Sequence, residues 1–134
     1  RHAESTRAEK MVRIADSDVA LRHLRVCYLN HGGAYNCGTC MKCLRAMTAL
    51  TALGAMDRCP TFARPLSRRR VARTWYNSEL TRNLAAENLA LFARYGGDPG
   101  LERALRDSLD DKYYRGAWKV GRQAWWRLKR LARR

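Results

Sequence analysis

Four of the five cysteines lie close together in the sequence, at spacings that suit a metal ion. Cys37, Cys40 and Cys43 form a Cys-x-x-Cys-x-x-Cys run, and Cys27 lies ten residues upstream. A gap of two residues lets neighbouring thiolates converge on one ion while the backbone turns around it, and Gly38 stands where such a turn favours a left-handed residue. Four thiolates around Zn²⁺ form a closed tetrahedral site, which is structural rather than catalytic. The spacing therefore predicts a structural zinc site on these four cysteines.

The cysteines also allow other interpretations. The Cys-x-x-Cys-x-x-Cys run is the core of the bacterial ferredoxin motif, in which the last ligand precedes a proline. Cys59 followed by Pro60 supplies such a pair, so an iron–sulfur cluster on Cys37, Cys40, Cys43 and Cys59 is the main alternative. Disulfide bonds are disfavoured by the odd number of cysteines and by the lack of a signal peptide. Free buried thiols that act as small apolar residues are the remaining interpretation.

The cysteine-rich stretch is similar to a known protein family. The layout Cys27-x9-Cys37-x2-Cys40-x2-Cys43 resembles the zinc-binding C-terminal region of the 7-cyano-7-deazaguanine synthases (QueC/ExsB), which are PP-loop ATP pyrophosphatases. The resemblance covers roughly residues 20–60 and implies a zinc site of the same layout. The ATP-binding Ser-Gly-Gly-x-Asp-Ser motif of that superfamily does not occur in this sequence. The resemblance thus implies a zinc site without ATP chemistry. It suggests that the chain is the C-terminal part of a longer protein, with a catalytic domain or subunit upstream.

The remaining sequence offers no pattern of catalytic residues. It contains no Ser/His/Asp, Cys/His or paired-carboxylate arrangement, and none of the three histidines stands in a recognisable motif. Four thiolates would leave zinc no open position for a substrate or a water. We therefore assign no catalytic and no cofactor-binding residue other than the metal ligands, and the sequence leaves open whether the chain is part of an enzyme.

Helical periodicity predicts a mostly α-helical fold, a small helical domain organised around the four-cysteine zinc knuckle. We use zinc knuckle for the four cysteines and the turns between them. The expected helices are Glu4 to Ala15, Asp18 to Leu24, Cys40 to Leu53, a basic helix capped by Ser67 and running through Arg73, Glu79 to Tyr95, a helix opened by Asp98 and Pro99, and Asp111 to Arg134. We divide the chain into a zinc-knuckle helical region over residues 1–62, a second helical region over 63–111, and a basic aromatic helix over 112–134.

The chain is strongly basic, with a formal net charge of +15 and a pI near 10.5. The excess is concentrated in two runs, which would attract nucleic acid, an anionic lipid surface or an acidic partner. A general preference of the genome for arginine is the plain alternative. The candidate polyanion-binding residues are Arg68, Arg69 and Arg70 in the first run, and Arg115, Lys119, Arg122, Arg127, Lys129 and Arg130 in the second.

The C-terminal segment combines this charge with aromatic side chains. Tyr114, Trp118, Trp125 and Leu128 recur at steps of three, four and seven residues, which places them on one face of a predicted amphipathic helix. Such a helix suits an anionic membrane surface, where indole rings lie at the headgroup level. It also suits nucleic acid, with arginine on phosphate and aromatic rings on unpaired bases. Simple docking of the tryptophans on the rest of the protein is the third interpretation.

Three functions of different classes are consistent with these features. The first is a structural, non-catalytic zinc-binding C-terminal region of a PP-loop ATPase-like protein. The second is a stand-alone zinc-knuckle protein that binds nucleic acid. The third is an accessory protein attached to a membrane surface through the basic C-terminal helix. Because no apolar run approaches the ~18 residues of a membrane-spanning helix, and because reduced cysteines are typical of the cytoplasm, we expect a cytoplasmic location, peripheral to a membrane under the third hypothesis.

Overall fold

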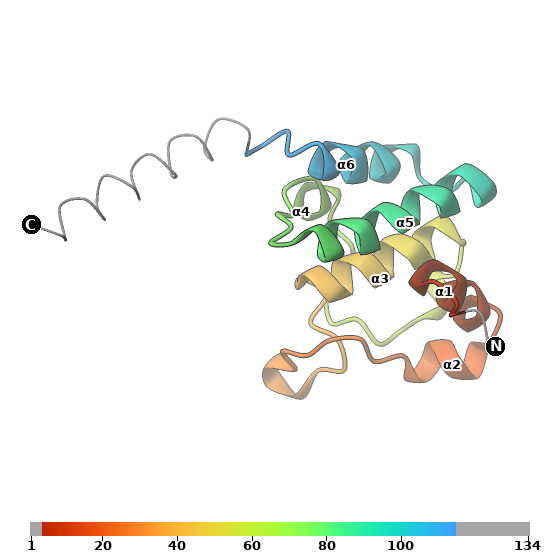
Figure 1. The fold of residues 1–134 in the computed structure, drawn as a ribbon. Helices are drawn as coiled ribbons and strands as arrows, with labels where there is room; N and C mark the ends of the chain where they lie inside the picture. Colours follow the sequence, from red (N-terminus) through yellow and green to blue (C-terminus); the bar gives the residue numbers. More distant parts are fainter. Residues whose placement is uncertain (1–3, 115–134) are drawn as a thin grey trace, which may run out of the picture.

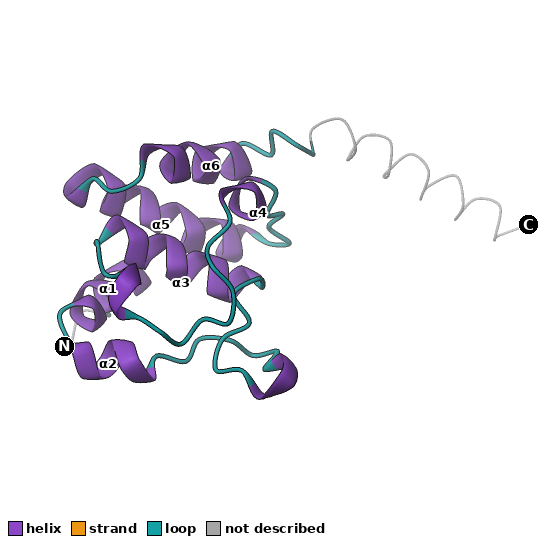
Figure 2. Cartoon of the chain, turned by 180° about the vertical axis from the view of Figure 1, so that it is seen from behind, coloured by secondary structure: helices purple, strands orange, loops and turns teal. Residues whose placement is uncertain are grey.

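The computed structural model describes residues 4–114, and α-helices make up most of this part of the chain (Figure 1). The predicted mostly α-helical fold is therefore confirmed. No strand occurs between residues 4 and 114, where a single isolated bridge joins Asn36 and Phe62 (Figure 2). The helices are α1 (Arg7–Ala15), α2 (Asp18–His23), α3 (Met41–Ala52), α4 (Arg68–Ala72), α5 (Glu79–Tyr95) and α6 (Pro99–Leu109), with short 3-10 turns η1 (His31–Gly33) and η2 (Met56–Arg58).

Polar side chains fix where these helices begin. Ser17, Ser67 and Ser78 each accept a hydrogen bond from the backbone N–H three residues ahead, at the starts of α2, α4 and α5. At the start of α1, the Thr6 hydroxyl accepts from the backbone of Glu9, whose carboxylate accepts in turn from the Thr6 N–H at 2.8 Å. The cap at Ser67 is the one that the sequence predicts.

Helix α6 begins at Asp98, as predicted, with Pro99 at its first position. One Asp98 carboxylate oxygen accepts from the N–H groups of Gly100 and Leu101, and the other pairs with Arg68 at 2.6 Å. The Arg68 guanidinium holds the pKa of Asp98 below its usual range. The same carboxylate therefore caps α6 and ties it to the start of α4.

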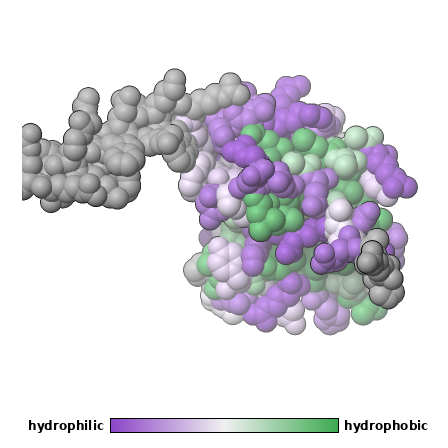
Figure 3. All heavy atoms as spheres, in the orientation of Figure 1, coloured by the Kyte–Doolittle hydropathy of each residue, from purple (hydrophilic) through white to green (hydrophobic). Residues whose placement is uncertain are grey.

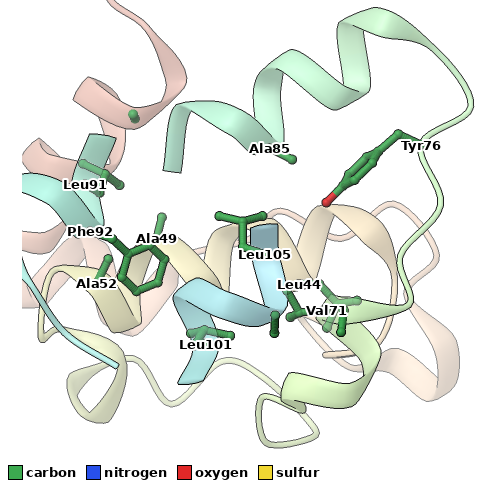
Figure 4. Packing of buried hydrophobic residues seen from close by; sticks show 13 residues of the cluster. Leu44, Ala49, Ala52, Val71, Tyr76, Ala85, Leu91, Phe92, Leu101 and Leu105 are labelled. Carbon is green, nitrogen blue, oxygen red and sulfur yellow. The ribbon is translucent and has the colours of Figure 1, made fainter. Parts of the chain in front are cut away.

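Helix α3 is the centre of the domain. Most of its side chains are buried, and it packs against α1 and α5, while α4 packs against α6. Leu101 and Leu105 of α6 are buried in the same hydrophobic core as Leu44 of α3 and Phe92 of α5 (Figure 4). Residues of both helical regions, 1–62 and 63–111, therefore contribute side chains to this one core. Tyr76 closes one side of it, with its hydroxyl 3.1 Å from Ser108 Oγ.

A second, smaller cluster of buried residues is formed by side chains of α1, α2, α3 and the segment that follows α3. It contains Ala15, Leu21, Leu50 and Ala55, together with the fifth cysteine, Cys59. Leu50 belongs to α3 and is fully buried, so this helix contributes to both clusters. Burial of such side chains is the main source of stability in a domain of this size. The position of α3 therefore determines how the other helices can pack.

The structure corrects the prediction that the last helix starts at Asp111. Residues 111–114 form turns, and Asp111 itself has a left-handed backbone with a φ of 53°. Its carboxylate pairs with Arg82 at 2.7 Å, which fixes this turn against α5. The rest of the predicted helix, with its three tryptophans, lies outside the described residues. None of the helices within residues 4–114 combines the length and the apolar character that crossing a membrane requires.

Candidate metal centre

The structure brings Cys27, Cys37, Cys40 and Cys43 together. Their four Sγ atoms all lie within 4.8 Å of one another. Two of the separations, from Cys27 to Cys40 and from Cys37 to Cys43, are 3.9 Å. Three of the cysteines are buried, and Cys40 is partly exposed. The group is therefore positioned to hold a metal ion, with one sulfur close to solvent.

A tight turn positions Cys37 and Cys40. The Sγ atom of Cys37 accepts hydrogen bonds from the backbone N–H groups of Thr39 at 3.4 Å and Cys40 at 3.3 Å. The turn requires a left-handed residue at Gly38, where φ is 76°. A Cβ atom at this position would lie 2.7 Å from the backbone oxygen of Arg64. Glycine is therefore needed here both for backbone conformation and for close packing.

Helix α3 begins at the metal centre. Cys40 is its N-terminal cap, and the Cys40 Sγ atom accepts from the N–H of Cys43 at 3.4 Å. Unpaired N–H groups give the first turn of a helix a partial positive charge, which stabilises anions placed there. Thiolates at Cys40 and Cys43 benefit from this charge. The helix that carries much of the core is thus the one anchored on two of the four candidate ligands.

Asn36 holds the remaining segments in place, a role that the sequence analysis missed. This side chain is fully buried. Its Oδ1 atom accepts from the backbone N–H groups of Val26 at 2.8 Å and Cys27 at 3.1 Å. Its Nδ2 group donates to the Leu24 carbonyl and to the Thr61 hydroxyl, each at 2.8 Å. One amide therefore joins the segment that carries Cys27 to residue 36, next to Cys37, and to the chain after η2.

The chain after η2 also covers the cysteines. The backbone N–H of Ala63 donates to the carbonyl of Asn36 at 2.9 Å, which forms the bridge beside Phe62. Phe62 packs against the buried cysteines. The position of Asn36 directly before Cys37 was the available signal in the sequence, but nothing local indicated that its partners lie 9 to 25 residues away.

The thiols differ in how readily they ionise. Burial opposes ionisation of Cys37, but hydrogen bonds from Thr39 and from the Cys40 N–H outweigh it and lower its pKa to about 5. Burial also opposes ionisation of Cys27. Hydrogen bonds from backbone groups outweigh it, so the pKa of Cys27 lies below its usual value. Burial raises the pKa of both Cys40 and Cys43. Without a cation, the group therefore holds a mixture of thiolates and thiols at neutral pH.

Cys59 is not a member of the four-sulfur group. It is buried in the smaller cluster, where its thiol donates a hydrogen bond to the Leu21 carbonyl at 3.2 Å. The residue that the iron–sulfur alternative requires as a ligand is thus engaged with the backbone at the end of α2. The thiol of Cys59 also lies 3.5 Å from the hydroxyl of Thr61.

The predicted polyanion-binding residues fall into two sets. In α4, Arg68 pairs with Asp98, whereas Arg69 and Arg70 are exposed and line a cavity of about 620 Å³ together with Arg73. The others lie outside the described residues: Arg115, Lys119, Arg122, Arg127, Lys129 and Arg130.

The chain matches no family model, no curated protein and no solved structure.

Replacing Asn36 by alanine should destabilise the protein. The change leaves the N–H groups of Val26 and Cys27 without their acceptor, and each unpaired buried group costs about 1–3 kcal/mol. We expect the free energy of unfolding in urea to fall by about 3 kcal/mol or more, together with weaker metal binding. Asn83→Ala, at an exposed position of α5, is the matched control and should change stability by less than about 0.5 kcal/mol. Equal stability of the two variants would contradict the role of Asn36.

Metal binding should release protons from some of the cysteines only. At pH 7 Cys37, with a pKa of about 5, is already ionised, whereas Cys40 and Cys43 must each lose a proton to become ligands. The apparent affinity for zinc should therefore fall as the pH falls, and fall more steeply below about 5, where Cys37 also becomes protonated. Calorimetry in buffers of different ionisation heat measures the protons released per metal. Release of one proton from every ligand at pH 7 would contradict the low pKa of Cys37.

Proposed function

We propose that this chain is a non-catalytic helical module stabilised by one structural zinc ion. The observation that carries the proposal is the spacing of the four sulfur atoms. A tetrahedral ion with Zn–S bonds of about 2.3 Å places its ligands about 3.8 Å apart. Two of the separations here are 3.9 Å, and all lie within 4.8 Å. With four protein ligands, zinc has no open position for water or substrate. Its contribution is then to the fold.

The same spacing favours a single ion over an iron–sulfur cluster. In a [4Fe–4S] cluster each thiolate binds a different iron, and in a [2Fe–2S] cluster two thiolates bind each iron, so the cysteine sulfurs surround several atoms rather than one. The hydrogen bond of Cys59 to Leu21 also supports zinc, because the alternative needs Cys59 as a ligand. Zinc on Cys27, Cys37 and the two cysteines at the start of α3 uses every sulfur of the group.

Zinc would join three segments of the chain directly through its ligands. They are the extended stretch that carries Cys27, the turn that carries Cys37, and the first turn of α3, which is capped by Cys40. Since the unfolded chain has no preformed site, the binding energy of the ion adds to the folding energy. For a domain of this size, such a contribution is comparable to the whole stability of an ordinary small protein.

We further propose that the module belongs to a PP-loop ATPase-like protein related to the 7-cyano-7-deazaguanine synthases. The spacing of the four cysteines in the sequence supports this context. The catalytic domain would then lie upstream in the same protein or in a partner subunit, most simply in the cytoplasm. A Ser-Gly-Gly-x-Asp-Ser motif encoded before Arg1, or in a subunit that copurifies, would support it.

Elemental analysis of protein purified without added metal tests the zinc site. We expect about one zinc per chain and no visible absorption band. Cys40→Ser removes a ligand that is partly exposed, so it should lose the metal and melt at a lower temperature. Cys59→Ala, outside the four-sulfur group, is the matched control and should retain the metal. Iron with sulfide and a broad visible band would overturn the proposal.

The surface beside the knuckle favours polyanion binding as a second candidate function. The cavity there lies between Thr39, which belongs to the cysteine turn, and the arginines of α4. Arg69, Arg70 and Arg73 line it together with hydroxyl groups, and no acidic residue is among its described lining residues. Arginines and hydroxyls are the usual partners of nucleic-acid phosphates. We infer that a single-stranded nucleic acid would pass over this cavity.

A salt titration with a single-stranded oligonucleotide tests the second candidate. Affinity should fall steeply with salt, and the double variant Arg69→Ala/Arg70→Ala should reduce the slope of log K against log salt by about 1–2. The control Arg13→Ala/Arg22→Ala removes two exposed charges elsewhere and should leave most of the binding. Absence of binding, or binding that salt does not weaken, would contradict this function. Binding to phosphatidylserine vesicles alone would instead favour the membrane hypothesis.

A further inference from the structure

A separate cavity of about 370 Å³ lies between α1, the stretch after α2, α3 and α5. Figure 1 shows that α1, α3 and α5 come close together in this part of the domain. On the face shown in Figure 3, apolar residues are exposed between hydrophilic ones. The volume is within the range of cavities that hold small molecules. The stretch after α2 contributes Arg25 and Val26, which directly precede the candidate ligand Cys27.

The charged lining of this cavity is entirely positive. Five cationic side chains take part and no described acidic residue does: Arg7 and Lys10 from α1, Arg25 from the stretch after α2, and Lys42 and Arg45 from α3. None of the ion pairs between described residues involves any of these five. Clustered like charges repel one another, so the arrangement favours an anionic occupant.

Cations elsewhere in the domain have carboxylate partners, whereas no described carboxylate lines this cavity. Elsewhere in the described part of the chain, Arg58 pairs with Asp18 at 2.7 Å and Arg106 pairs with Glu102 at 2.8 Å. Burial, followed by the positive charge of Arg7, lowers the pKa of Arg45, which is the least exposed of the five cations. The nearby acid, Glu87, is held by the backbone N–H of Ala8 at 3.1 Å and does not line the cavity.

The uncharged residues that line the cavity indicate what else, besides an anionic group, a bound molecule would contain. It is almost entirely aliphatic, and the part that is described contains no aromatic ring on which a base could stack. Asn88 is the one uncharged polar side chain in this lining, and its Nδ2 group already donates to the carbonyl of Arg45. The aliphatic lining residues are Met11, Ile14, Leu24, Val26, Ala46, Ala49 and Leu84. A hydrocarbon chain would therefore fit this wall better than a nucleobase.

We propose that this cavity binds an amphipathic phosphate ester, in which an aliphatic chain carries a phosphate or diphosphate group. The aliphatic chain of the ligand lies against the wall formed by α1, α3 and Leu84 of α5. The phosphate lies at the cations, where guanidinium groups supply charged and directional hydrogen bonds. Such a group occurs both in soluble prenyl or alkyl phosphates and in the headgroups of anionic phospholipids. The cavity is distinct from the arginine-lined cavity beside the knuckle, with which it shares none of its described lining residues.

Binding of geranyl diphosphate to the metal-loaded full chain, measured by calorimetry at physiological salt, tests the proposal. We expect saturable binding of one molecule. Inorganic pyrophosphate lacks the hydrocarbon chain, and geraniol lacks the charge, so each should bind at least about tenfold more weakly. Vesicles containing phosphatidic acid distinguish the two sources. Strong vesicle binding with weak binding of geranyl diphosphate would assign the site to a membrane lipid, and the reverse would assign it to a soluble ester.

The double variant Arg7→Ala/Lys10→Ala locates the site. Both side chains are exposed on α1 and make no ion pair with a described residue, so the variant should fold. It should weaken binding of geranyl diphosphate at least about tenfold. The control Arg13→Ala/Arg22→Ala removes equal charge outside the cavity and should change the affinity for geranyl diphosphate less than about threefold. Equal weakening by both double variants, or no saturable binding of either the ester or the vesicles, would overturn the proposal.

Discussion

Four cysteine sulfur atoms that all lie within 4.8 Å of one another cannot all be charged unless a cation lies among them. This constraint governs the first half of the domain. The elements that carry the cysteines are a stretch without regular structure, a tight turn and the first turn of a helix. Of these, only α3 has a large buried surface of its own. The other two are held by hydrogen bonds to Asn36 and to sulfur, and by whatever ion the sulfurs bind.

The metal centre and the hydrophobic core are joined through one helix. Cys40 caps α3, and Leu50, three turns further along, is fully buried between the helices. A displacement at the sulfur group therefore moves the first turn of the element against which α1 and α5 pack. The thiol pKa values fit this arrangement. Burial disfavours charge on Cys40 and Cys43, which belong to the helix, while backbone donors favour charge on Cys27 and Cys37, which precede it.

The features that depend on neighbours in the sequence were predictable. The serine caps, the Asp98–Pro99 start of α6 and the convergence of the four cysteines follow from local hydrogen bonding and from ligand spacing. The role of Asn36 could not be predicted, because its four partners come from two other segments, residues 24–27 and Thr61. The cation-lined cavity could not be predicted either, since Arg7 and Arg45 meet only when α1 packs on α3. The turn at Asp111 depends in the same way on Arg82, 29 residues earlier.

The stretch between Cys27 and Cys37 makes few contacts at its tip, although Asn36 at its end is fully buried. Gly32 and Gly33 at its tip have left-handed backbones, and a Cβ atom on either would meet nothing within 4 Å. Loop-closure entropy changes by only about 0.6 kcal/mol when a loop doubles in length. The tip is therefore where this domain can accept inserted sequence. A peptide placed between the two glycines would be flanked on both sides by candidate ligands of the same ion, Cys27 and Cys37.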